Sequence, residues 1–328
     1  MNNQQEKAAV QDVDAAINVF AKPWQTALSL LSLHKQSGSH IREYWLQFEP
    51  VGSKYDAISP YTMVPYLINE LGLRVHVYQP EEWQARKPAS LERLREKNYR
   101  KQLRYGDAFE NSRNHFLFIT HNDVFFRRDL ILALKHNISD AFAIGKLGQC
   151  WNCPASNAEI MASVMGLPPC TPDRYMELRP TFEQLGKLYQ KAREINFPAR
   201  PYEREHFSEE FARQPWPLPE CRINEWAFLL NLELARPYAI PFGTAWPPGA
   251  YRDCSGHNLD VVTPLFRDLH AQGLHAKHFD PSDYMNHWVG TGNKSPARYA
   301  YSEDRAKKLL EKFFPDYVKW VDGIKKNN

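Results

Sequence analysis

A short apolar run that stops abruptly at polar residues sets the strongest limit on the architecture. His115–Thr120 reads His-Phe-Leu-Phe-Ile-Thr, which has the length and composition of a buried β-strand. The triplet His121-Asn122-Asp123 follows directly, and apolar residues at helical spacing resume over Val124–Leu134. In open α/β sheets, ligands bind beyond the carboxyl ends of the strands. The pattern therefore predicts an α/β protein that binds a ligand at the triplet.

Strand and helix signals alternate along the first part of the chain. We predict strands over Ala27–Leu33, Ile41–Phe48 and Arg74–Tyr78, with a helix from Ser59 to Gly72 before the last of them. Charge and leucine spacing over Pro88–Phe109 are typical of a surface helix. This order of elements indicates a sheet of mononucleotide-binding style flanked by helices.

The rest of the chain divides into a leader, an insertion and a final segment. Residues 1–14 are polar and mixed in charge, and Gln4–Phe20 carries Ala, Val and Ile at loosely helical spacing, so we predict that residues 1–22 form a leader that is mobile or docks as a helix. Fourteen of the 24 prolines lie between residues 154 and 248, and we interpret residues 146–219 as a Pro/Cys-rich insertion. Helices are expected over Phe182–Asn196, Arg222–Ala235, Leu265–Gln272 and Ser302–Val321, the last broken before Pro315.

Composition excludes several classes of protein. The 41 Lys and Arg residues nearly balance the 38 Asp and Glu residues, which argues against a dedicated nucleic-acid binder. No apolar run approaches the roughly 18 to 20 residues that span a bilayer, so we expect at most peripheral membrane contact, through the lysine-rich C-terminal segment. Five cysteines are too few for a disulfide scaffold and favour a reducing compartment. We therefore expect a cytoplasmic protein, in peripheral contact with the inner face of a membrane if with any.

The segment Phe116–Leu130 resembles the strand and acidic triplet of glycosyltransferases with the GT-A fold, particularly the large inverting family 2. In that family the last Asp of the triplet helps to bind a divalent metal at the diphosphate of the nucleotide sugar. The resemblance implies that Asp123 contacts Mg²⁺ or Mn²⁺ and the diphosphate, with Asn122 beside it. His121 and Asn122 replace the other acidic residues of the motif, and both can ligate metals.

Two later segments resemble further motifs of the same family, in the same order. Arg222-Ile-Asn-Glu225-Trp226 resembles the acidic motif that supplies the catalytic base, which implies that role for Glu225. Tyr284–Gly292 resembles a later segment with His and Gly, which implies that His287 ligates the metal or meets the diphosphate. Arg104 and Tyr105, just before the central strand, are predicted to place a cation and a stacking ring near the nucleotide.

The resemblance implies a GT-A-like, Rossmann-like mixed sheet flanked by helices, with the insertion as a cap. Residues 23–145 would form the nucleotide-sugar-binding half. Residues 220–328 would form the acceptor and catalytic half with the C-terminal helix. The implied function is transfer of a sugar from a nucleotide-sugar donor to a glycan, a lipid-linked saccharide or another hydroxyl acceptor.

Each central residue also has a structural alternative that needs no ligand. Asp123 would cap the helix that follows it. Glu225 would be a solvated carboxylate in the first turn of a helix. His287 would be a histidine of the core, satisfied by its neighbours.

Cysteine and histidine clusters suggest other metals. Cys150 and Cys153 form a CxxC pair, and with Cys170 and Cys221 they supply four thiolates for a structural Zn²⁺. Buried thiols or a redox pair are the alternatives. The run from His275 through His278 to Asp280 would instead suit a metal-dependent hydrolase.

Other functions remain open from the sequence alone. A sugar nucleotidyltransferase is one of them, although Ser37-Gly38-Ser39 is only a faint phosphate loop. A non-catalytic carbohydrate-binding protein is another. Tryptophans that would line a sugar-stacking cleft, or fill the core instead, are Trp151, Trp216, Trp226, Trp246 and Trp288.

Overall fold

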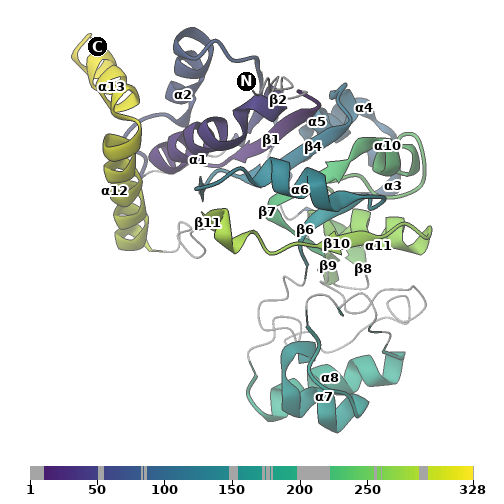
Figure 1. Ribbon diagram of the computed structural model, residues 1–328. Coiled ribbons are helices and arrows are strands. Elements are labelled where there is room, and N and C mark those ends of the chain that lie inside the picture. Colours follow the sequence, from purple (N-terminus) through teal and green to yellow (C-terminus); the bar gives the residue numbers. More distant parts are fainter. Residues whose placement is uncertain are drawn as a thin grey trace, which may run out of the picture.

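Figure 1 shows the computed structural model, in which a seven-stranded sheet lies at the centre. The strand order is β10-β6-β7-β4-β1-β2-β3. The structure describes residues 11–50, 55–82, 84, 87–147, 154–171, 174, 178, 180–197, 222–254, 257–259, 261–287 and 295–327.

Four parallel strands form one half of the sheet. They are β1 (Val13–Val19), β2 (Ile41–Phe48), β3 (Val75–Tyr78) and β4 (Phe116–His121). All seven residues of β1 are buried, and β1 lies between β2 and β4. The predicted leader over residues 1–22 is therefore wrong for the described part, because residues 13–19 form a central strand.

The other half of the sheet makes it a mixed one. β7 (Ile223–Asn231) runs antiparallel to β4 and to β6 (Ala143–Leu147), and β10 (Ala276–His278) is parallel to β6. The predicted helix over Arg222–Ala235 is wrong for its first part, which is β7, and only its end is helical, as α10 (Leu232–Ala235). A strand buried on both faces is a continuous apolar run, and periodicity alone does not separate such a run from a buried helix.

The helix α1 (Pro23–Ser37) replaces the predicted strand over Ala27–Leu33. Pro23 occupies the first turn, where its missing N–H costs nothing. Twelve of the fifteen residues are buried, including all three of its serines. Because the helix is covered on nearly all sides, its sequence lacks a polar face and resembles a buried strand.

The C-terminal helices α12 (Pro296–Phe313) and α13 (Pro315–Asn327) meet at the break predicted before Pro315. Figure 1 shows α12, in yellow, lying across the end of α1. The buried carboxylate of Glu303 accepts hydrogen bonds from the backbone N–H groups of Trp24 and Gln25, at 3.0 and 3.2 Å. A residue of α12 thus caps the first turn of α1.

Replacing Glu303 with Ala is expected to lower the free energy of unfolding by about 2 kcal/mol, because two buried N–H groups lose their acceptor. Denaturant unfolding followed by circular dichroism measures this change. Glu311→Ala on the same helix removes an exposed carboxylate 3.8 Å from Lys307 and should cost less than about 0.5 kcal/mol. Equal losses for both variants would contradict the capping role.

A small antiparallel ladder extends beyond β4. It pairs β5 (Val124–Phe126) with β11 (Met285–His287), and His287 lies opposite Val124. The predicted helix over Val124–Leu134 is therefore wrong for its first part, and α6 spans Leu130–Ile138. Asp129 caps α6 by accepting a hydrogen bond from the Leu132 N–H, so the capping alternative for Asp123 is excluded.

Other predicted helices are confirmed, with shifted ends. The segment from Ser59 to Gly72 is helical over Pro60–Glu70, and Pro88–Phe109 divides into three short helices. In Figure 1, α7 and α8 lie together below the sheet. The remaining elements are η1 (Gly38–His40), η2 (Pro60–Thr62), α2 (Met63–Pro65), η3 (Tyr66–Glu70), α3 (Leu91–Arg95), α4 (Lys97–Gln102), α5 (Gly106–Asn111), η4 (Pro154–Ser156), α7 (Ala158–Met165), α8 (Phe182–Glu194), α10 (Leu232–Ala235), η7 (Arg236–Tyr238), β8 (Arg252–Cys254), β9 (His257–Leu259), α11 (Thr263–Ala271) and η8 (Pro281–Asp283).

Within the described ranges, no helix combines the length and apolar character that crossing a membrane requires.

Candidate active site

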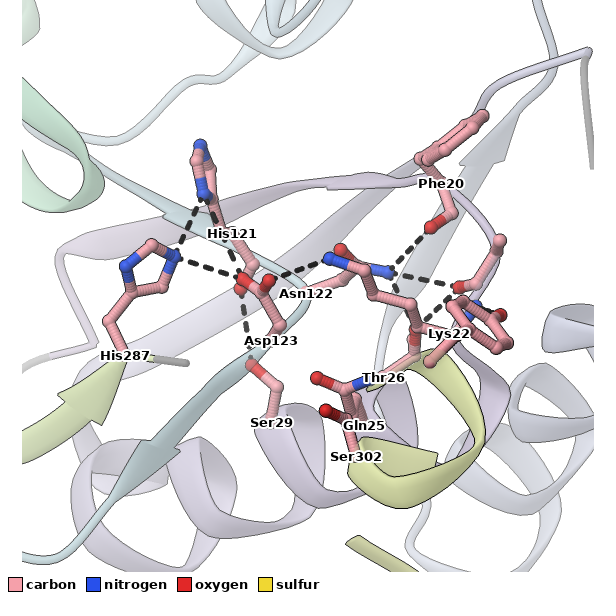
Figure 2. Close-up of polar contacts among 12 residues, drawn as sticks. Phe20, Lys22, Gln25, Thr26, Ser29, His121, Asn122, Asp123, His287 and Ser302 are labelled. Carbon is pink, nitrogen blue, oxygen red and sulfur yellow. Dashed lines mark hydrogen bonds and ion pairs between the residues drawn. The ribbon is translucent and has the colours of Figure 1, made fainter. Parts of the chain in front are cut away.

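The predicted triplet lies at the carboxyl end of β4, and α1 supports it from below (Figure 2). The Ser29 hydroxyl donates a hydrogen bond to the carbonyl of His121, at 3.2 Å. The buried amide nitrogen of Asn122 donates to the Ala21 carbonyl and to the Thr26 hydroxyl, at 3.1 and 2.8 Å. Asn122 therefore fixes the loop between β1 and α1, a role that the sequence pattern did not reveal.

His121, Asp123 and His287 converge from β4 and β11 (Figure 2). His287 Nε2 lies 3.1 Å from Asp123 Oδ1 and 3.3 Å from His121 Nδ1. One ligand atom from each of the three side chains falls within 4.8 Å of the others. The pairing of β5 with β11 brings together residues 164 positions apart, so the core-histidine alternative for His287 gives way to a polar cluster.

Lys22 is a member of the site that the sequence analysis missed. Its Nζ lies 2.7 Å from Asp123 Oδ2, and both side chains are about nine-tenths buried (Figure 2). The backbone at Lys22 is left-handed, with φ 57°, and its N–H donates to the Tyr299 hydroxyl at 2.8 Å. The only sequence signal was a basic residue before a helix-opening proline, in a segment that we had assigned to the leader.

Glu225 lies on β7, and the helical first-turn alternative is excluded. Its Oε1 is 3.2 Å from His121 Nε2, and its buried Oε2 has no hydrogen-bond partner in the described part of the chain. Burial raises the pKa of Glu225, but the hydrogen bond to His121 and the charges of His121, Arg222 and Arg104 outweigh it and lower the pKa to about 2. Glu225 is therefore an ionised carboxylate in contact with His121.

The ionisation of the other two groups suits metal binding. Burial raises the pKa of Asp123, but the charge of Lys22 and the hydrogen bond from His287 outweigh it and hold the pKa well below its usual range. Burial lowers the pKa of His287 despite its contact with Asp123. An ionised carboxylate and a neutral imidazole are the forms that bind metals.

Arg104 and Tyr105 lie between α4 and α5, beside the end of β2. The Arg104 guanidinium pairs with Glu49, with 2.6 Å between Nη2 and Oε1. The Tyr105 ring is only 3% exposed and belongs to the core, and its backbone N–H donates to Gln47 Oε1 at 2.9 Å. The predicted stacking of Tyr105 on a nucleotide thus has no support, because packing against the sheet occupies the ring.

Trp226 is the tryptophan nearest to the cluster in the described ranges. Its ring stacks on the His287 ring, with centroids 4.8 Å apart and planes at 19°. Lys146 Nζ lies 5.8 Å from the centre of the Trp226 ring. Trp246 is buried, and Trp151, Trp216 and Trp288 lie outside the described residues.

Of the other predicted metal sites, the cysteine site lies mostly outside the described residues and the histidine site lies within them. Cys150, Cys153 and Cys221 lie outside the described residues, and the Cys170 thiol contacts the Thr171 carbonyl, so structural zinc stays a prediction. His278 Nδ1 accepts a hydrogen bond from the Leu147 N–H, and His275 Nε2 lies 3.4 Å from Asp140. Among the described residues, His121, Asp123 and His287 are the group that meets metal-site geometry, and His275, His278 and Asp280 are not.

Comparison with known proteins gives similarity in fold. No protein-family model and no curated protein matches the sequence. The chain matches S. aureus TarS residues 1–349 with 9% identity and a TM-score of 0.42, covering 92% of this chain and 65% of that one, just under two thirds.

Two further solved structures are sugar transferases. Galactosyltransferase LgtC, in complex with donor and acceptor sugar analogues, has 8% identity, a TM-score of 0.42 and coverage of 92% of this chain and 96% of that one. Mannosyltransferase PcManGT from Pyrobaculum calidifontis, in complex with GDP-Man and Mn²⁺, has 10% identity, a TM-score of 0.37 and coverage of 96% and 80%. The seven-stranded mixed sheet flanked by helices confirms the predicted α/β fold class, while the Pro/Cys-rich cap stays a prediction. Identities this low leave the activity to be argued from the site.

Proposed function

We propose that this protein is a GT-A-type glycosyltransferase that moves a sugar from a nucleotide-sugar donor to a hydroxyl acceptor. One observation carries the proposal: His121, Asp123 and His287 meet at the carboxyl ends of the parallel strands, with Glu225 against His121. Ligands of open α/β sheets bind at this edge. A departing diphosphate needs positive charge, which Lys22 and a bound metal would supply here.

The side chains fit a divalent metal and narrow its identity. Two imidazoles and one carboxylate offer nitrogen as well as oxygen, whereas Mg²⁺ prefers an all-oxygen shell. Of the two ions expected from the sequence, we therefore propose Mn²⁺, held by His121, Asp123 and His287. The contact of Glu225 with His121 Nε2 fixes the ring so that Nδ1 faces Asp123. Bound Mn²⁺ would neutralise charge on the leaving diphosphate.

The transfer step assigns a role to Glu225. The acceptor oxygen bonds to the anomeric carbon as the bond from that carbon to the diphosphate oxygen breaks, and its electron pair leaves with the nucleoside diphosphate. The hydroxyl proton passes to a carboxylate, for which we propose Glu225 through its unpartnered Oε2. Attack from the face opposite the leaving group inverts the anomeric centre, so we propose an inverting enzyme.

Contacts with the two substrates follow from the placement of the side chains. We propose that the exposed part of the Trp226 ring packs against a glycan or lipid-linked saccharide acceptor, since sugar rings stack on aromatic faces. Asn122 holds the loop between β1 and α1 through Ala21 and Thr26, and we propose that this loop faces the donor. Arg104 lies close enough to Glu225 to lower its pKa, and we propose it as a cation on the nucleotide side.

Replacing Lys22 with Met removes the cation that occupies Asp123 Oδ2. We expect the Mn²⁺ affinity to rise about tenfold, because a charge at this distance changes the cation affinity of a carboxylate by at least that much. Turnover should fall, since the diphosphate loses a positive partner. Calorimetric titration with Mn²⁺ measures the first effect, with Lys35→Met on the exposed face of α1 as a matched control. An unchanged Mn²⁺ affinity in folded Lys22→Met would contradict this competition.

A panel of UDP-, GDP-, CDP-, ADP- and dTDP-sugars tests the proposed function. The purified protein is incubated with each donor, with Mn²⁺ or with EDTA, and the released nucleoside diphosphate is quantified with and without saccharide acceptors. We expect Mn²⁺-dependent release from at least one donor, increased by an acceptor that gains the sugar. If nucleoside diphosphate is released but no sugar-bearing acceptor fraction gains the sugar, the result would favour the hydrolase alternative.

A further inference from the structure

A second polar site lies beside the cluster of His121, Asp123 and His287, at the ends of β1 and β2. It is a shallow pocket whose lining includes Asn18, Gln47, Glu49, Gln84, Gln102 and Arg104. Asn18 is the register partner of His121 across the sheet, so the pocket and the cluster share one edge. A ligand that extends along this edge would contact both.

The pocket contains hydrogen-bond acceptors that have no donor. In the described part of the chain, buried oxygens without a partner include one from each of four lining residues: Asn18 Oδ1, Glu49 Oε2, Gln84 Oε1 and Gln102 Oε1. Asn18, Glu49 and Gln84 are each more than nine-tenths buried. Buried acceptors normally have partners, because leaving one without a donor costs free energy. Four of them around one pocket indicate a ligand that supplies donors.

The contacts of these side chains explain which oxygen of each is left without a partner. The Asn18 amide nitrogen donates to Glu49 Oε1 at 2.7 Å, which leaves Asn18 Oδ1 as the unpartnered atom. The Gln84 amide nitrogen donates to Glu82 Oε2 at 3.1 Å, which leaves Gln84 Oε1 in the same way. Arg104 also pairs with Glu49 Oε1, so the second carboxylate oxygen is the one that remains.

Among the nucleobases, guanine matches this arrangement best. Its N1–H and its N2 amino group lie side by side and present three N–H donors along one edge. Adenine and cytosine each offer one amino group, and uracil and thymine each offer a single N–H between two carbonyl oxygens. A uracil carbonyl placed here would face unpartnered acceptor oxygens, which is repulsive.

We propose that this pocket selects the donor nucleotide and that it takes the donor edge of a guanine base, so that the sugar donor is a guanosine diphosphate sugar. The inference rests on the function proposed above and adds the class of donor. Glu49 Oε2 accepts from N1–H, and the amide oxygens of Asn18 and Gln102 accept from the two protons of the N2 amino group. The unfilled space of the pocket is about 270 Å³ including open solvent, and in this proposal the edge of the base enters it while the ribose and diphosphate extend toward the cluster.

Calorimetric titration of the full chain with GDP, UDP, CDP and ADP in the presence of Mn²⁺ tests the proposal. We expect GDP to bind at least about 100-fold more tightly than UDP, because a site built to pair with N–H groups strongly rejects an analogue that lacks them. Glu49→Gln should remove most of this preference by weakening GDP while leaving UDP nearly unchanged. Glu92→Gln, an exposed carboxylate on α3, is the matched control and should keep the wild-type order.

The possible outcomes separate the two proposals. UDP binding as tight as GDP binding to the wild-type protein would overturn the guanine assignment and leave the glycosyltransferase proposal standing. A preference for GDP that persists in folded Glu49→Gln would overturn the role of this pocket. The failure of all four nucleotides to bind would overturn the guanine assignment, and the failure of dTDP as well would overturn both proposals.

Discussion

Asp123→Ala is expected to reduce Mn²⁺-dependent sugar transfer by at least about 1,000-fold, because the metal loses the carboxylate of the cluster and the leaving diphosphate then loses the positive charge of the metal. His121 and His287 alone would bind Mn²⁺ more weakly, so calorimetry should show a matching loss of Mn²⁺ affinity. Initial rates of nucleoside diphosphate release at saturating donor measure the first effect.

Removal of Asp123 also leaves Lys22 buried without its partner, which destabilises the fold by itself. The double variant Lys22→Met with Asp123→Ala removes both charges and separates this effect from catalysis. It should recover much of the lost stability and none of the activity. Asp283→Ala, an exposed aspartate near β11, controls for loss of a carboxylate. Normal turnover by folded Asp123→Ala would exclude the assigned role.

Glu225→Gln is expected to lower turnover by about 100-fold while the Mn²⁺ affinity stays within a few-fold of wild type. The amide oxygen of Gln still accepts the hydrogen bond from His121, but Gln cannot take a proton from the acceptor. The expected loss is at the low end for general bases because a carboxylate with a pKa of about 2 is a weak base. Steady-state transfer rates at saturating Mn²⁺ measure it.

The same variant separates two roles for Glu225. If Glu225 only orients His121, Glu225→Gln keeps its turnover at saturating Mn²⁺, and Glu225→Ala weakens Mn²⁺ binding about 10- to 100-fold. That pattern would assign the base to another group. Asn224→Asp on the same strand offers no control, since the Asn224 amide nitrogen donates to the Lys146 carbonyl at 3.0 Å. Glu233→Gln, exposed beyond the end of β7, changes a carboxylate without touching the cluster.

The strand β4 and its triplet could be predicted because the strand-like apolar run ends abruptly in the polar residues that begin at His121. Strand β1 could not, since the buried Asp14 and Asn18 interrupt its apolar pattern. Asp14 is satisfied by Ser112 and Asn114, at 2.7 Å each, from a segment that no local pattern connects to it. A polar residue paired at long range resembles a loop residue in sequence.

The candidate site shows the same division. Asp123 and Glu225 were both predicted as site residues. The helix expected around Glu225 is a strand, and the prediction failed because periodicity does not distinguish a strand buried on both faces from a helix. His287 was found through the family resemblance and is placed by the pairing of β5 with β11. Lys22 was missed because its partner lies 101 residues away and its own segment carried no strand signal.

The central claim is that one edge of this sheet binds a nucleotide-sugar diphosphate through Mn²⁺ held by His121, Asp123 and His287. Calorimetric titration of the wild-type protein with nucleoside diphosphates, in Mn²⁺ and again in EDTA, tests it most directly. We predict saturable binding in Mn²⁺ that weakens at least about tenfold in EDTA and is lost in Asp123→Ala. No saturable binding of any nucleoside diphosphate by the folded wild-type protein in Mn²⁺ would contradict it.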